Sequence, residues 1–89
     1  MLSGQECFEF CGLTEDEIHA IAEHEHVPEI VAAELGQCLL QTHVGIWLIR
    51  RYLLEDIQQA ELHGHDGRAK WLHSVLDRFT IDHPTYTHL

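Results

Sequence analysis

The strongest constraint on the fold is a helical repeat of apolar positions through the middle of the chain. Its members follow one another at steps of three or four residues: Val31, Leu35, Cys38, Thr42, Ile46, Ile49, Leu53, Ile57 and Ala60. These steps amount to eleven residues for every three turns, which is close to the natural period of a straight α-helix. The pattern therefore predicts a long central helix over about residues 28–62.

A helix of that length conflicts with a compact small domain. Unbroken, it would be roughly 50 Å long, whereas a globule of 89 residues is about 30 Å across. The helix is therefore expected either to break near Gly45 or to be completed by a second chain. Gly36 and Gly45 weaken a helix but also let another backbone approach closely. We favour self-association into a helical bundle, because further apolar residues lie outside the repeat: Leu39, Leu40, Trp47, Leu48 and Leu54.

The residues before the central helix predict two shorter helices. Thr14 followed by Glu17 is the signature of a capping box and predicts a helix over about 15–26. Pro28 ends this helix and suits the start of the next one. A weaker box upstream predicts a short helix over 4–11.

The residues after the central helix predict a helical hairpin. Residues 63–67 read as a loop in which Gly64 ends the long helix. A last helix over about 67–80 then turns apolar residues back onto the central one: Ala69, Leu72, Leu76 and Phe79. Residues 81–89 read as an irregular tail. The sequence thus predicts one all-helical domain over residues 1–89.

The charge distribution narrows the choice of partners. The net charge is −10, and residues 1–49 contain nine acidic residues and no lysine or arginine. A surface of this sign repels phosphates, so we expect neither nucleic acid nor an anionic membrane as a ligand. Cations or a basic protein partner remain, and the sequence contains no organic-cofactor motif.

The cysteines and the hydropathy pattern point to the cytoplasm. No stretch approaches the ~20 apolar residues of a membrane span, and the first residues lack the pattern of a signal peptide. Three cysteines are an odd number for a disulfide framework. Cys7 and Cys11 fit apolar packing better than a thiolate zinc site, and Cys38 belongs to the apolar repeat.

Histidine and glutamate on the helix over 15–26 form the candidate metal site. His19, Glu23 and His26 fall within about 60° of arc at 100° per residue. Imidazole and carboxylate groups one turn apart can bind divalent iron or zinc. The competing interpretation is that they are solvated residues beside the core face.

Glu23 and His26 also read E-x-x-H, the pairing used in carboxylate-bridged helical bundles. Such bundles need two of these motifs and two further glutamates, and this chain supplies half of the set. A dimer could complete it, with Glu29 or Glu34 as the additional carboxylate.

The other histidines favour structural roles. His63 and His65 could chelate a metal from the loop, but His63 suits the C-terminus of a helix better. His73 and Asp77 are expected as an exposed pair or as a contact to a partner, and His43 as exposed or interfacial.

The primary functional hypothesis is therefore a divalent-metal-binding helical protein. The alternative is a non-enzymatic interaction or assembly module whose acidic half binds a basic partner. An enzyme assembled at an oligomer interface has the least support, because no nucleophile or cofactor motif is present.

Overall fold

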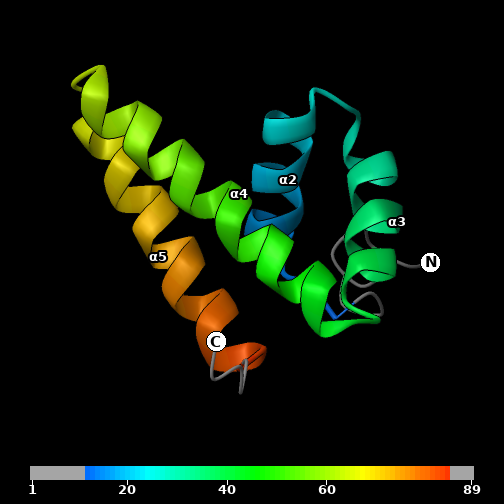
Figure 1. The fold of residues 1–89 in the computed structure, drawn as a ribbon. Coiled ribbons are helices and arrows are strands. Elements are labelled where there is room, and N and C mark those ends of the chain that lie inside the picture. The colour runs from blue at the N-terminus through cyan, green and yellow to red at the C-terminus, as the bar shows by residue number, and fades with distance from the viewer. Residues whose placement is uncertain (1–11, 85–89) are drawn as a thin grey trace.

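The computed structural model describes residues 12–84, which form four α-helices and, within that range, no strand. The helices are α2 (Glu15–Glu25), α3 (Glu29–Leu39), α4 (His43–Leu62) and α5 (Asp66–Asp82). Figure 1 shows them as two hairpins, α2 with α3 and α4 with α5, and the first hairpin packs along α4. The predicted all-helical class and the C-terminal hairpin are confirmed.

The two ends of α2 follow from the local sequence. The Thr14 hydroxyl accepts a hydrogen bond from the Glu17 amide at 3.2 Å, and the Glu17 carboxylate accepts one from the Thr14 amide at 2.9 Å. This is the predicted capping box. At the other end, His26 adopts left-handed angles (φ 57°, ψ 46°) and ends the helix. α3 begins directly after Pro28.

The structure corrects the continuous helix predicted over residues 28–62 and contains the break near Gly45 instead. α3 ends at Leu39, and α4 begins where the Thr42 hydroxyl accepts a hydrogen bond from the Gly45 amide at 2.9 Å. Gly45 lies so close to α3 that a Cβ there would overlap the Leu39 carbonyl. The fold-back keeps the largest dimension of the molecule at 40 Å, shorter than the roughly 50 Å of an unbroken helix.

The apolar repeat keeps its predicted phase in α4 but loses it in α3. In α4 Ile46 is partly buried, and the other members of the repeat are buried: Ile49, Leu53, Ile57 and Ala60. In α3 the buried residues are the small Ala32, Ala33 and Gly36, whereas Val31 and Cys38 are exposed. A Cβ at Gly36 would overlap a side chain just before α2. Close helix packing, rather than side-chain bulk, therefore selects the buried face of α3.

The hairpin of α4 and α5 turns at a glycine and a capping histidine. Gly64 takes φ +71°, and His63 Nδ1 donates to the Gln59 carbonyl at 2.8 Å. The predicted capping role of His63 is confirmed. α5 continues to Asp82 rather than ending at residue 80, so the irregular tail begins later than predicted. The buried residues of α5 are Ala69, Leu72, Val75 and Phe79.

Some predictions lie outside the described residues, namely the helix over 4–11, the roles of Cys7 and Cys11, and the tail beyond residue 84. Within residues 12–84, no helix combines the length and the apolar character that crossing a bilayer requires. Self-association remains a prediction.

Candidate functional site

His19, the first of the three predicted metal ligands, lies between two carboxylates. Its Nε2 is 3.3 Å from a Glu23 oxygen, and its Nδ1 is 3.1 Å from a Glu29 oxygen at the start of α3. Both ring nitrogens can donate to these oxygens only when each carries a proton. Because the carboxylates face different ring nitrogens, they do not converge on one coordinating nitrogen. The imidazole thus lies between two carboxylates of its own chain.

Glu23, the second predicted ligand, is neutralised by a cation from the other half of the chain. Arg68 donates from Nη2 to Glu23 Oε1, and its guanidinium lies 5.6 Å from the centre of the Trp71 ring. His19 meets the same indole edge-on, with ring centroids 5.8 Å apart. These contacts join α2 to α5 and place an arginine beside the carboxylate that a metal ion would use.

His26, the third predicted ligand, lies outside the helix that carries the other two. It is the C-cap of α2, so the helical spacing behind the prediction ends at Glu25. Glu29 does reach His19, whereas Glu34 is exposed on α3. Across residues 12–84, no three His, Cys, Asp or Glu side chains are grouped so that they could hold a metal ion.

His24, to which the sequence assigns no role, makes a polar contact between α2 and α4. Its Nδ1 donates to Asp56 Oδ1 at 3.0 Å, and both side chains are only 20% exposed. The imidazole also stacks on Tyr52 at 4.3 Å between ring centroids. Burial, followed by the nearby Glu25 and Glu55 carboxylates, raises the pKa of Tyr52. This cluster makes part of the seam between the two hairpins polar.

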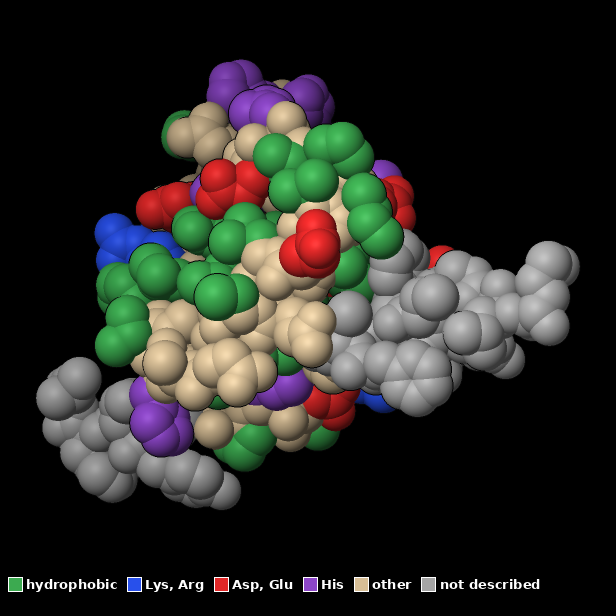
Figure 2. All heavy atoms as spheres, turned by 90° about the vertical axis from the view of Figure 1, so that its right-hand side faces the viewer, with side chains coloured by type: hydrophobic (Ala, Val, Ile, Leu, Met, Phe, Trp, Pro, Cys, Tyr) green, Lys and Arg blue, Asp and Glu red, His purple; other side chains and the backbone are tan. Residues whose placement is uncertain are grey.

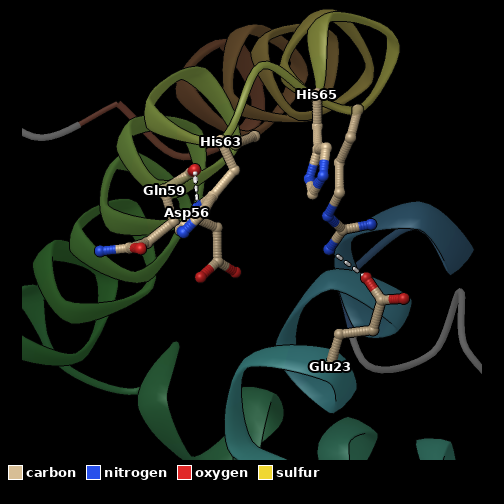
Figure 3. Close-up of a pocket in the computed structure, with 7 residues that line it drawn as sticks. Glu23, Asp56, Gln59, His63 and His65 are labelled. Atoms are coloured by element: carbon tan, nitrogen blue, oxygen red, sulfur yellow. Dashed lines mark hydrogen bonds and ion pairs between the residues drawn. The ribbon is translucent and has the colours of Figure 1, made fainter.

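A small cavity of about 160 Å³ lies where the turn between α4 and α5 approaches α2 (Figure 3). Its polar lining consists of Glu23, Asp56, Gln59, His63, His65 and Arg68. Figure 3 shows side chains of α4 and the turn facing Glu23 across the cavity. The rings of His63 and His65 lie 6.0 Å apart. Since Glu23 binds Arg68 and Asp56 binds His24, the carboxylates that face the cavity are already paired within the protein.

His73 and Glu17 are both used within the fold. His73, expected beside Asp77, lies instead 3.6 Å from Glu61 on α4. Glu17 is 1% exposed, and its Oε2 is buried without a hydrogen-bond partner among the described residues. Burial is the main cause that raises the pKa of Glu17, and the capping bond from Thr14 opposes it. These contacts give both residues structural roles.

The side of α4 opposite the core carries a row of surface residues, here called the α4 outer stripe. It consists of Val44, Trp47, Arg51, Leu54, Glu55, Gln58 and Leu62. At 100° per residue these positions occupy about 100° of arc, centred opposite the buried Ile49 and Leu53. Its apolar members are well exposed: Val44 at 68%, Trp47 at 46%, Leu54 at 44% and Leu62 at 78%. His43, just before the stripe, is also exposed.

The middle of the stripe combines an aromatic ring with a charge pair. The Arg51 guanidinium lies 5.5 Å from the Trp47 ring centre, and its Nε is 3.4 Å from Glu55 Oε2. Trp47, Arg50, Arg51 and Leu54 line a shallow depression of about 150 Å³. The stripe is thus an apolar surface with one arginine and one glutamate at its centre.

A second exposed apolar area lies on α3, and the charged residues of this helix are all acidic. Ile30 is 66% exposed and Val31 41% exposed, with the exposed acids Glu29 and Glu34 nearby in sequence. Figure 2, which looks onto the α3 side of the molecule, shows hydrophobic side chains interspersed with acidic ones. The arginine of the α4 outer stripe has no counterpart on α3, which contains no lysine or arginine.

The long-range pairs that engage Glu23 and His24 could not be found from local sequence patterns. Glu23 and Arg68 are 45 residues apart, and His24 and Asp56 are 32 apart. The charge distribution was one available signal. Because residues 1–49 contain no lysine or arginine, their acidic side chains can pair with such a cation only from the rest of the chain. Comparisons with protein-family models, with curated proteins and with solved structures gave no match.

Proposed function

We propose that the protein is a non-enzymatic protein–protein interaction module that binds through the α4 outer stripe. The observation that carries this proposal is the exposure of Trp47, Leu54 and Leu62 on one side of a helix whose other side is buried. Tryptophan and arginine are enriched among the residues that dominate binding energy at interfaces. An amphipathic helix that presents such a row suits a groove or a second helix as its partner.

The contacts of the acidic half favour α4 over the acidic residues as the binding face. Glu23 binds Arg68, Glu29 binds His19, and Glu17 is buried in the capping box. These carboxylates are engaged within the chain, so fewer remain for the basic partner that the sequence suggests. We also propose a cytoplasmic location, which the cysteine count supports, because three is an odd number for the disulfide framework of a small exported domain.

Site-specific photo-cross-linking in the cells that make the protein tests this proposal. A photoreactive phenylalanine analogue replaces Trp47 or Leu54 in the stripe, and Lys70 or Thr80, both exposed on α5, in the controls. We expect discrete cross-linked products from the stripe positions and few from the controls. Equal or absent cross-linking at all four positions contradicts the proposal.

Divalent-metal binding is a second proposal, which one observation favours. His19 already lies within 3.3 Å of carboxylate oxygens from Glu23 and Glu29. If Arg68 released Glu23 and the side chains turned so that both carboxylates approached the same ring nitrogen of His19, they would provide one imidazole and two carboxylates, a donor set suited to zinc or iron. The proposed set differs from the sequence prediction in that Glu29 takes the place of His26.

Thermal unfolding of untagged protein with and without Zn²⁺ or Fe²⁺ tests the second proposal. Saturation to about 100 times Kd would add about 2.7 kcal/mol of stability. His19→Ala should remove this gain, whereas His73→Ala, which removes an exposed histidine paired with Glu61, should keep it. An unchanged melting temperature with either metal contradicts metal binding.

A further inference from the structure

The order of apolar and charged residues along the α4 outer stripe indicates which molecule binds to it. We infer that the occupant is a second copy of this chain, with its α4 lying antiparallel to the first. This inference rests on the proposed function, because it specifies the partner for the same surface. Three features support it: the order of residues along the stripe, the charge pair at its centre, and the access to this side of α4.

The charge pair excludes one orientation and favours the other. In a parallel pair of α4 helices, Arg51 would face Arg51 of the second copy and Glu55 would face Glu55, so like charges would meet. In an antiparallel pair centred near residue 53, each Arg51 faces Glu55 of the other copy. Two salt bridges then form across the centre, from groups that pair within one helix in the single chain.

The same register matches the remaining members of the stripe. Val44 at one end meets Leu62 of the second copy, and both are among the most exposed apolar side chains of the described residues. Trp47 lies at the level of residue 59 of the second copy and so next to Gln58 of that copy's stripe, whose amide can lie against the edge of the indole. Because the register is symmetric about residue 53, one two-fold axis repeats every contact and closes the assembly as a dimer.

Access to the stripe agrees with this arrangement. In Figure 1, α5 runs beside α4, and α4 crosses in front of the first hairpin. The apolar members of the stripe stay exposed despite these contacts. α4 has 20 residues and is roughly 30 Å long, so the stripe runs along its whole length. A contact made mainly by one helix from each copy lies at the low end of specific interfaces, so we expect reversible binding in the micromolar range.

Charge exchange in the full chain tests the register directly. Sedimentation analysis over about 5–500 µM, bracketing the expected range of Kd, should show wild-type protein passing from monomer to dimer. Arg51→Glu places glutamates opposite Glu55, and Glu55→Arg places arginines opposite Arg51. Each variant alone should therefore bind itself at least about tenfold more weakly. An equimolar mixture of the two restores opposite charges at both contacts and should recover the wild-type mass distribution, as should the double variant.

Arg78→Glu is the matched control, because Arg78 forms an i,i+4 pair with Asp82 on α5 at 2.7 Å and lies outside the stripe. It should leave the dimer unchanged, and circular dichroism checks that each variant remains folded. Wild-type protein that stays monomeric at 500 µM, or a mixture that fails to restore the dimer, overturns the inference. Cross-links from Trp47 to a different protein would then still support the interaction function, whereas no cross-link from the stripe rejects both.

Discussion

The histidine-rich side of α2 and the α4 outer stripe differ in whether their side chains are already satisfied. On α2, Glu23 binds Arg68 and His24 binds Asp56, so both groups are engaged in holding the two hairpins together. On α4, Trp47 and Leu54 project from the helix while its other side forms the core. The difference teaches that residue type alone is a poor guide to function in this protein. The more informative property is whether a side chain is paired or buried within the fold or remains exposed on the surface.

The uneven charge distribution explains why polar side chains of α2 are paired with groups from other helices. The chain has five lysine and arginine residues, all in its second half, against fifteen acids. Among the acids of the first half, Glu23 therefore pairs with Arg68 from α5, and Glu29 lies against the imidazole of His19. Arg51 pairs with Glu55 in its own helix, one turn away, and so stays on the outer surface.

Two adjacent leucines on α4 test the difference between its buried and exposed faces, with the largest expected change in the free energy of unfolding. Leu53 is 2% exposed and Leu54 is 44% exposed. We expect Leu53→Ala to lower the free energy of unfolding by about 2–5 kcal/mol, because it leaves a cavity, and Leu54→Ala by less than about 1 kcal/mol. Urea unfolding at low protein concentration, where self-association is negligible, measures both. Similar losses would mean that the two faces of α4 are not distinct.

Two glycines test the close approach that divides α3 from α4. A Cβ at Gly45 would overlap the Leu39 carbonyl, whereas one at Gly67 in α5 meets no atom within 4 Å. Gly45→Ala should destabilise the protein by about 1–3 kcal/mol through overpacking. Gly67→Ala should stabilise it by about 0.5–1 kcal/mol, because alanine is the better helix former. Thermal unfolding of both variants checks the prediction, which fails if Gly45→Ala is neutral.

Two histidines test the difference between a side chain with contacts inside the fold and one exposed to solvent. His24 is hydrogen-bonded to Asp56 and stacked on Tyr52, whereas His43 is exposed at the start of α4. His24→Ala should cost about 1–2 kcal/mol of stability, from one hydrogen bond and one ring contact. His43→Ala should change it by less than about 0.5 kcal/mol. Chemical unfolding at pH 7 distinguishes them, and equal effects would remove the structural role given to His24.

Glu17 provides the smallest and most specific test, through pH. Burial raises its pKa in the folded state above the ordinary value. The stability it contributes is therefore fully present below the unfolded-state pKa and is lost as pH rises through the folded-state pKa. Glu17→Gln stays neutral and retains the acceptor for the capping bond from Thr14. Its stability relative to wild type should increase from pH 4 to pH 7, and a difference independent of pH would contradict the buried-acid assignment.

The sequence by itself determined the parts of this protein that depend on neighbouring residues. Thr14 and Glu17 predicted the start of α2, Gly64 the turn of the C-terminal hairpin, and the apolar repeat the buried face of α4. These signals act within about one or two helical turns, where backbone geometry fixes which side chains meet. Trp47 and Leu54 were likewise predicted to lie outside the core repeat.

The tertiary structure alone decided which of these groups remain available. Whether Glu23 faces a metal ion or Arg68 depends on how α5 packs against α2, across 45 residues of chain. The buried face of α3 depends on close contact at Gly36, which no hydrophobic pattern records. The physical reason is that ion pairs and packing form between segments whose relative position is set by the whole fold. The sequence therefore predicted the helices, and their packing determined which of their faces are open for binding.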